Sequence, residues 1–465
     1  MKLMEKERKI ERRISSFYLR GVFLVFIFLF VYSLTVANVF AEELGLKYEL
    51  DVPASTVYVT DFDGDGMNEL IVGTSKVGKS DYVYIYRFQN GKYEELWNYS
   101  IPEDGRWGGV TSLTVGDTDN DGKHELIVST GQPSDTGGDR KLRIFKKTND
   151  SLDSLKVVFT YDIGQRTEPA SIKVGDADND GKNEIVVGLS WYGSKIIQLK
   201  YSDETGDYKV SRVEETGSDV KSIDIVDLDG DGKNEIVAGT SCWKDYDVRV
   251  LEYESSYKCV WRKSIGYTIA TTGDVDGDGR LEILAVSGTH CGNVSTPRPR
   301  VWIFEYNKTR YKEVWNTSDF KTGGNFGQGS CNPVIGNLLD YSTNEFAFSM
   351  NINETHRNVY VYGFRDGEYK RLQTIPANPI SLYIGDSDNN GRSELLVCDN
   401  LDRTLKIYEL KIEAVKSNPE PAPTETQALR EEEKQIVPGI PGFGFCYALM
   451  TFTVVLFLKR FRVRR

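Results

Sequence analysis

DFDGDGMNE, residues 61 to 69, carries four carboxylates within nine positions, at Asp61, Asp63, Asp65 and Glu69. Like charges this close together repel one another in water, so the spacing makes sense if a cation lies among them. Oxygen ligands at alternate positions, with a glycine at position six for a sharp turn, are typical of calcium loops. The stretch therefore predicts a calcium site.

The segments on either side of this loop exclude a helical EF-hand, which needs a bidentate glutamate at position twelve and flanking helices. Position twelve is Val72. The preceding TVYVT and the following LIVGT are β-branched and aromatic runs that predict strands. The unit is thus a strand, a calcium loop and a strand, with its last acid at position nine.

This unit recurs along the chain, and internal repeats of this length determine the architecture. Further copies begin at Asp117 (DTDNDGKHE), Asp176 (DADNDGKNE), Asp227 (DLDGDGKNE), Asp274 (DVDGDGRLE) and Asp386 (DSDNNGRSE). Between the last two copies lies GNLLDYSTNEFAF, in which Asn337 and Glu345 hold positions one and nine. Leu339 and Tyr341 at positions three and five offer no carboxylate, so we expect this seventh copy to keep its strands and to bind no metal.

Each loop is followed by a second strand, an aromatic third strand such as YVYIYRF, and usually a fourth strand. Four short strands in each of seven repeats predict an all-β fold, a seven-bladed β-propeller with calcium-binding loops between strands 1 and 2 of most blades. The last repeat lacks a fourth strand, whereas LKYELDVPAS, residues 46 to 55, resembles one and precedes the first loop. We expect residues 46–52 to complete the last blade and close the ring.

Over residues 44 to 412 these repeats resemble the FG-GAP or VCBS repeats of the integrin α-chain propeller. The resemblance implies that calcium is held by the side chains at positions one, three, five and nine and by the carbonyl at position seven. The implied ligands are Asp61, Asp63, Asp65, Met67, Glu69, Asp117, Asp119, Asp121, Lys123, Glu125, Asp176, Asp178, Asp180, Lys182, Glu184, Asp227, Asp229, Asp231, Lys233, Glu235, Asp274, Asp276, Asp278, Arg280, Glu282, Asp386, Asp388, Asn390, Arg392 and Glu394. We expect five strong Ca²⁺ sites and a weaker sixth, where Asn390 removes one charge. We expect the ions to be structural rather than sensory.

The chain divides into four segments. Residues 1–41 carry a basic start and a long apolar run that ends in a small residue, which predicts a cleaved secretory signal peptide or, alternatively, a signal anchor. Residues 42–412 form the propeller, and residues 413–440 are a linker rich in Pro, Glu and Thr. Residues 441–465 hold a short apolar segment with a basic end, which predicts a membrane anchor. The segment also resembles the PGF-CTERM sorting signal of archaeal surface proteins. That resemblance implies the alternative, a tail that is cut and replaced by lipid.

Composition agrees with a protein exported to the cell surface. The formal net charge of −12 argues against nucleic acid as a partner. Cys242 with Cys259 and Cys291 with Cys331 allow two disulfides, although free thiols fit the spacing equally well. Glycosylation sequons occur at Asn98, Asn149, Asn293, Asn307, Asn316 and Asn353.

No catalytic residues are predicted, because the sequence shows no zinc spacing, nucleophile elbow or phosphate-binding glycine loop. We therefore expect no enzyme but a module that binds a protein or glycan at the cell surface. Aromatic residues on the loops opposite the acidic ones are the candidate contacts: Trp107, Trp191, Tyr192, Trp243 and Phe326. These rings fit packing on their own blades equally well. The alternative is an extracellular propeller lyase or hydrolase acting on polysaccharide. An uncommitted Lys, Arg, His or Tyr cluster in the central funnel would favour the enzyme, whereas a broad aromatic face would favour the binding module.

Overall fold

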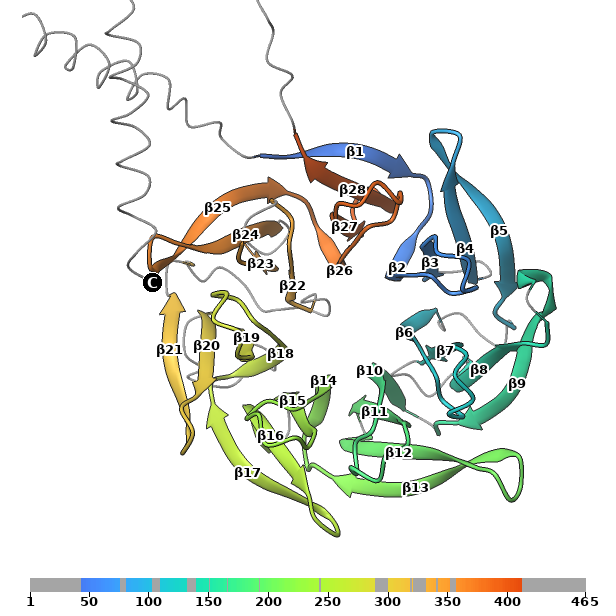
Figure 1. Ribbon diagram of the computed structural model, residues 1–465, viewed down its shortest axis with the longest axis horizontal. Helices are drawn as coiled ribbons and strands as arrows, with labels where there is room; N and C mark the ends of the chain where they lie inside the picture. The colour runs from blue at the N-terminus through green and yellow to red at the C-terminus, as the bar shows by residue number, and fades with distance from the viewer. Residues whose placement is uncertain are drawn as a thin grey trace, which may run out of the picture. The chain divides into compact units, whose positions relative to one another are not determined.

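In the computed structural model, seven four-stranded antiparallel sheets surround a central axis within the described part of the chain (Figure 1). The structure describes residues 43–75, 81–102, 109–131, 139–149, 151–164, 166–191, 193–241, 244–288, 300–317, 320, 332–339, 342–351 and 357–411. The predicted seven-bladed all-β propeller is therefore confirmed.

The two inner strands of each blade flank the acidic loop. The first strands are β2 (Ala54–Thr60), β6 (Val110–Gly116), β10 (Thr167–Gly175), β14 (Asp219–Val226), β18 (Tyr267–Gly273), β22 (Val334–Gly336) and β26 (Pro379–Gly385). The second strands are β3 (Glu69–Thr74), β7 (Glu125–Thr130), β11 (Glu184–Trp191), β15 (Glu235–Ser241), β19 (Glu282–Gly288), β23 (Glu345–Asn351) and β27 (Glu394–Asp399). The second strands are continuous apolar runs because both of their faces are covered by neighbouring blades.

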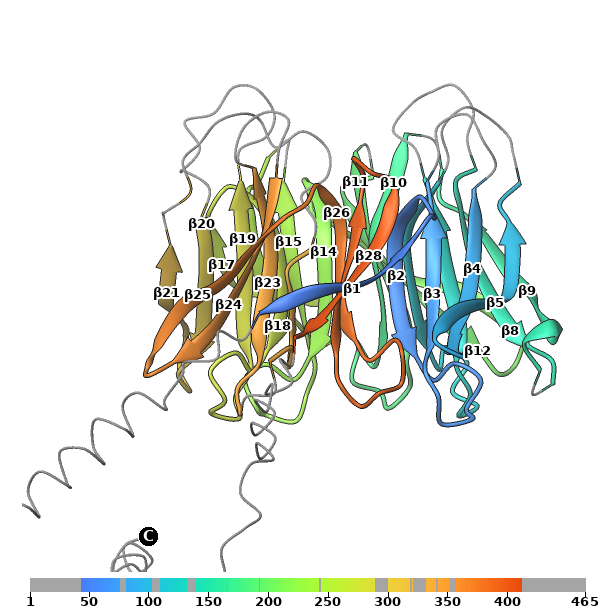
Figure 2. The ribbon, with the colours of Figure 1, turned by 90° about the horizontal axis from the view of Figure 1, so that it is seen from above.

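The outer strands are more polar because one face meets solvent. The third strands are β4 (Tyr82–Gln89), β8 (Lys141–Lys147), β12 (Lys195–Ser202), β16 (Asp247–Tyr253), β20 (Arg300–Tyr306), β24 (Arg357–Arg365) and β28 (Thr404–Leu410). The fourth strands are β5 (Lys92–Ser100), β9 (Leu155–Asp162), β13 (Asp207–Glu215), β17 (Tyr257–Ser264), β21 (Tyr311–Thr317), β25 (Glu368–Pro376) and β1 (Leu44–Leu50). A 3₁₀ turn, η1 (Leu152–Ser154), precedes β9. Because the strands are antiparallel, the acidic loops and the hairpins between third and fourth strands share one rim (Figure 2).

The ring closes through β1, which pairs antiparallel with β28 from Leu44 opposite Leu410 to Leu50 opposite Leu405. The predicted closure is confirmed, with a correction to its bounds: the strand ends at Leu50, and Ala54 already begins β2. The closing strand is also fastened to the sixth blade, since the Leu44 N–H donates to Gln373 Oε1 at 2.7 Å and Gln373 Nε2 donates to the Leu44 carbonyl at 2.9 Å.

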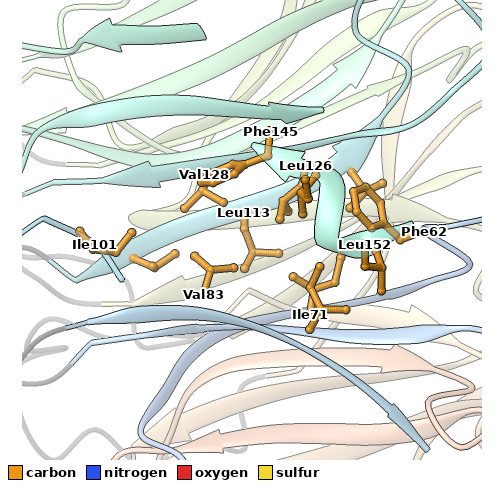
Figure 3. Packing of buried hydrophobic residues seen from close by; sticks show 13 residues of the cluster. Phe62, Ile71, Val83, Ile101, Leu113, Leu126, Val128, Phe145 and Leu152 are labelled. Carbon is orange, nitrogen blue, oxygen red and sulfur yellow. The ribbon is translucent and has the colours of Figure 1, made fainter. Parts of the chain in front are cut away.

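The hydrophobic core is divided among the junctions between neighbouring blades. Between the first two blades, Phe62, Ile71 and Val83 pack against Leu126 and Phe145 (Figure 3). Equivalent clusters join each following pair of blades, and the last one joins the seventh blade to the first. Burial of these side chains, at ~25 cal/mol per Å² of apolar surface, stabilises the packing of each blade on the next.

Innermost strands approach one another so closely that some positions admit no side chain. A Cβ at Gly116 would lie 2.7 Å from Val174 of the next blade, and one at Gly336 would lie 2.6 Å from Ile384. Glycine at the end of the first strand thus lets adjacent blades meet near the axis.

The terminal segments predicted at 1–41, 413–440 and 441–465 lie outside the described residues. A search of the described part of the chain found no helix with the length and apolar character needed to cross a membrane.

Candidate metal centres

The first aspartate of each intact acidic loop shapes the loop through hydrogen bonds to its backbone. In the first blade, Asp61 Oδ1 accepts from the N–H of Gly64 at 2.8 Å and of Asp65 at 3.0 Å, and Asp61 Oδ2 accepts from Gly66 at 2.8 Å. The bond from position six to position one recurs at 2.9 to 3.0 Å in the other five. Gly66 has a φ of +90°, which glycine adopts without a Cβ clash.

The glutamate at position nine is the first residue of each second strand and is at most 2% exposed. In all seven blades its Oε2 accepts the backbone N–H of position two, at 2.7 to 3.0 Å. This bond turns the other oxygen, Oε1, toward the aspartates. Because the bond is the same in every blade, the orientation of this carboxylate is set by the backbone.

Carboxylate oxygens from positions one, three and nine lie within 4.8 Å of one another in five loops, and one more group of this kind occurs among the described residues. In the fifth blade the group is Asp274, Asp276 and Glu282, and Glu282 Oε1 is buried without a hydrogen-bond partner in the described part of the chain. Hard oxygen donors converging on an unpartnered buried oxygen fit a calcium-type cation. These are the residues that the sequence predicted.

The aspartate at position five contributes differently. In the first blade, Asp65 Oδ1 accepts the N–H of Met67 at 2.9 Å, and Asp65 Oδ2 lies 2.8 Å from Arg87. It therefore closes the loop from the solvent side, whereas the other three acids converge inside it. None of the described contacts tests the predicted carbonyl ligand at position seven.

The third strand contributes a residue to each site that the sequence analysis missed. In the first blade Arg87 lies opposite Glu69 in the strand pairing and forms ion pairs with Glu69, Asp63 and Asp65. In the fifth blade the residue opposite Glu282 is Glu305 instead. The residue at this place therefore changes the charge of the site.

Burial opposes ionisation of the inner glutamates where the third strand brings no cation. Burial, assisted by the aspartates of the same loop, raises the pKa of Glu282 to about 8 and the pKa of Glu235 to about 7. Burial also raises the pKa of Glu69, but there the hydrogen bond from Arg87 works in the opposite direction. A carboxylate with such a pKa is costly to ionise until a cation arrives.

The degenerate sixth blade keeps the hydrogen-bonding frame without the acids. Glu345 Oε2 accepts the N–H of Leu338 at 2.9 Å, and Glu345 Oε1 pairs with Arg365. Asn337 lies exposed at position one. A guanidinium thus neutralises the buried glutamate, which agrees with the expectation that this loop does not need a metal.

Neighbouring loops are linked into a belt along the rim. Asn183 at position eight donates through Nδ2 to the carbonyl of Asp117 in the preceding loop at 2.8 Å, and Asn234 does the same to Asp176 at 2.9 Å. Tyrosines at the start of fourth strands add a second link between blades. For example, the Tyr208 hydroxyl of the third blade forms a hydrogen bond of 2.6 Å with Thr118 Oγ1 of the second blade. Loop geometry and blade packing are therefore coupled.

Of the five aromatic residues that we predicted to contact a ligand, Trp191 lies in the described part of the chain. Trp191 is half-buried and donates its indole N–H to Glu168 Oε2 at 2.8 Å within its own blade. Trp107, Tyr192, Trp243 and Phe326 lie outside the described residues. Their role in binding stays a prediction.

An aromatic cavity lies on the rim that bears the acidic loops. It has a volume of about 430 Å³ and lies between the fifth and sixth blades. Trp315 and Tyr369 form part of the cavity wall, and their ring centroids lie 5.2 Å apart. Asp276, from the carboxylate group of the fifth blade, also lines the cavity. Aromatic faces beside a carboxylate suit a sugar ring.

The innermost strands bring a Lys and Tyr cluster to the central channel. Tyr58, Lys173, Asp224 and Tyr383 all occupy the third position before the first acid of their loops. Lys173 Nζ lies 3.2 Å from Asp224 Oδ1, and the charge of Asp224 raises the pKa of Lys173, which is therefore a cation. The Tyr58 and Tyr383 rings lie 5.2 Å apart. Because its lysine is already paired with Asp224, this is not the uncommitted cluster that would favour the enzyme alternative.

Comparison with known proteins supports the repeat family. Residues 61–128, which span the first two acidic loops, match the family model of the FG-GAP-like repeat. The repeat unit over residues 61–128 is FG-GAP-like. Among solved structures, the chain is similar to the exotype rhamnogalacturonan lyase YesX at 16% identity and a TM-score of 0.46, over 79% of this chain and 74% of that one.

The expectation that this chain is not an enzyme is wrong, because the solved structure just named is a rhamnogalacturonan lyase. We therefore withdraw that expectation. At this level of identity the likeness concerns the fold, and it assigns neither a substrate nor a catalytic residue to this chain.

Cys259 is a free, exposed thiol whose Sγ donates to the Trp261 carbonyl at 3.4 Å. Cys242, the partner that the spacing allowed, lies outside the described residues. Cys291 and Cys331 lie outside the described residues.

Proposed function

We propose that the protein is an exported, calcium-binding β-propeller that recognises a polysaccharide or a protein at the cell surface. The observation that carries the calcium assignment is the repeated cluster of two half-buried aspartates and one buried glutamate, for example Asp274, Asp276 and Glu282. Side chains at positions one, three, five and nine would hold the ion. Bound calcium would supply the positive charge that lets the buried glutamate ionise.

Calcium that binds the folded state alone stabilises that state by mass action. The belt of hydrogen bonds between loops, such as Asn183 to Asp117, would pass this stabilisation from one blade to the next. A metal count and a melting curve with and without chelator test the assignment. Removal of calcium should lower the melting temperature, and a melting curve indifferent to chelator would contradict the proposal.

Recognition of a ligand is supported by the aromatic cavity beside the fifth loop. A glycan array probed with the purified protein, followed by Trp315→Phe and Trp315→Ala variants, tests it. Because Trp315 also packs against the core of the fifth and sixth blades, the phenylalanine variant serves as the matched control for folding. Equal binding by wild type and a folded alanine variant would exclude this cavity as the ligand site.

The second candidate function is an enzyme that acts on polysaccharide, and the channel cluster of Lys173, Asp224, Tyr58 and Tyr383 is the first place to test for it. A lysine held as a cation suits an acidic sugar, because it can neutralise the sugar carboxylate. Incubation with acidic polysaccharides, followed by the ultraviolet absorbance of unsaturated products and by release of reducing ends, distinguishes lyase from hydrolase. Activity that survives Lys173→Ala would show that the channel cluster is not the catalytic site.

A further inference from the structure

We propose that the acidic loops fall into two classes: the loops of the fourth and fifth blades require calcium, whereas those of the first three blades carry a built-in cation. This inference rests on the proposed calcium binding and assigns different affinities to the sites. The residue that separates the classes is the third-strand residue opposite the glutamate at position nine.

In the first three blades this residue is basic and reaches into the loop. Arg87 pairs with Glu69, as described above. Lys146 lies 3.4 Å from Glu125 Oε1 and also pairs with Asp119 and Asp121. One positive charge therefore already sits among the four acids of the second blade.

The third blade repeats this arrangement. Lys200 Nζ lies 2.9 Å from Glu184 Oε1 and 3.4 Å from Asp178 Oδ2, and it also pairs with Asp180. The acids of the first three loops are thus partly neutralised by the chain itself.

In the fourth and fifth blades the same place is acidic. Glu305 lies directly opposite Glu282. Glu252 follows Leu251, which pairs with Ile236, so Glu252 takes the place opposite Glu235. Each of these sites therefore has a fifth carboxylate where the first three blades have a cation from the third strand.

Among the described residues, no cation forms an ion pair with the inner acids of these two blades. Arg280 pairs with Asp278 and Glu305, but its side chain is 51% exposed and lies at the rim, outside the group formed by Asp274, Asp276 and Glu282. The repulsion among the inner acids is therefore left for an external cation to offset.

Unpartnered buried groups at these two sites point independently to a missing ligand. Glu282 Oε1 is buried without a hydrogen-bond partner in the described part of the chain. The Tyr311 hydroxyl, which approaches the fourth loop from the next blade, is also unpartnered there, although Tyr311 is only 9% exposed. Tyr311 packs with Leu228, the second residue of the fourth acidic loop, in one hydrophobic cluster.

Buried oxygens without hydrogen bonds also occur in the second and third blades, at Glu125 and Glu184. There, however, Lys146 and Lys200 lie nearby and compensate the charge. The seventh blade has a glutamate at the third-strand place, Glu409, but the closing strand supplies Lys47, 2.8 Å from Glu409 and 2.5 Å from Asp388. It therefore belongs with the self-neutralised class.

The charge difference beside the ion is large. Replacing a positive by a negative side chain a few ångströms from a divalent cation changes its dissociation constant by at least about tenfold, even at the dielectric constant of water. Calcium should therefore fill the loops at Asp227 and Asp274 first. The loops at Asp61, Asp117 and Asp176 should fill only at higher concentration.

Calcium titration of the full-length protein by calorimetry, with a metal count at low free calcium, tests this order. We expect two tightly bound ions in the wild type. Glu252→Lys should lower this count to one, and Lys146→Glu should raise it to three. Lys141→Glu makes the same charge change at the far end of the strand that carries Lys146, so it is the matched control and should leave the count at two.

Each outcome separates this inference from the proposed function. A single class of sites whose count does not respond to Glu252→Lys or Lys146→Glu would overturn the two classes and leave calcium binding intact. Binding of no calcium would overturn both. Should Glu252→Lys fail to fold, Lys146→Glu decides alone, because its extra tight ion is a gain that misfolding cannot produce.

Discussion

The cost of ionising a buried glutamate should be visible in the metal-free protein through Glu282→Gln. Glu282 has a pKa of about 8 in the folded state, against 4.5 as its ordinary value. At pH 7 the unfolded chain has lost this proton while the folded protein keeps it. Because pH 7 lies about 2.5 units above the ordinary pKa, ionisation of the unfolded chain lowers the stability of the folded state by about 3 kcal/mol, at ~1.36 kcal/mol per unit. Glutamine can accept the Val275 N–H without ever ionising, and it escapes this cost.

The assay is thermal unfolding in excess chelator across pH. With an entropy of unfolding of about 2.1 cal/mol/K per residue over residues 44 to 410, about 3 kcal/mol corresponds to a melting temperature about 4 °C higher for the variant at pH 7. The folded wild type binds more protons than the unfolded chain between about pH 4.5 and 8, so its metal-free stability should fall as pH rises through that window. The advantage of glutamine should vanish near pH 4.5.

Glu345→Gln in the sixth blade is the matched control. Glu345 is equally buried but is paired with Arg365, so losing its charge should destabilise the protein by about 2 kcal/mol with or without chelator. In saturating calcium the sign for Glu282→Gln should reverse, because the variant lacks a charged ligand. A Glu282→Gln protein that melts below the wild type in chelator at pH 7 would refute the reasoning.

Three further predictions concern the frame around the sites. Deleting Leu44–Leu50 should expose the edge of β28 and cause aggregation, measured by light scattering, and a monomeric protein with unchanged melting would contradict ring closure. Tyr208→Phe should cost about 1 kcal/mol in chemical denaturation by removing the hydroxyl contact with Thr118, and no loss would show that this link between blades is not stabilising. Lys173→Ala should lower the melting temperature slightly at neutral pH, because it removes the ion pair with Asp224. At a pH low enough to protonate Asp224, the melting temperature should hardly change. A decrease that does not depend on pH would mean that loss of the ion pair is not the cause of the destabilisation.

The spacing within DFDGDGMNE was enough to predict the loop and its frame. Ligand positions one to nine lie within a single turn between two strands, so their arrangement is a local property that the order of residues determines. For this reason Glu69 in the first blade and Glu345 in the sixth make the same hydrogen bond to position two of their loops. The number of blades followed in the same way, because each repeat must form the same four strands to bury its apolar second strand.

The tertiary structure decided which other residues enter each site. The residue opposite position nine follows it by 18 positions at Arg87 and by 23 at Glu305, because the connection between second and third strands varies in length. Only the pairing of the strands brings each of these residues to its glutamate. Lys47 is 341 residues away from Asp388 and reaches it only because the ring closes. The acidic loops thus have nearly the same sequence, but their charge balance depends on side chains that folding brings from elsewhere in the chain.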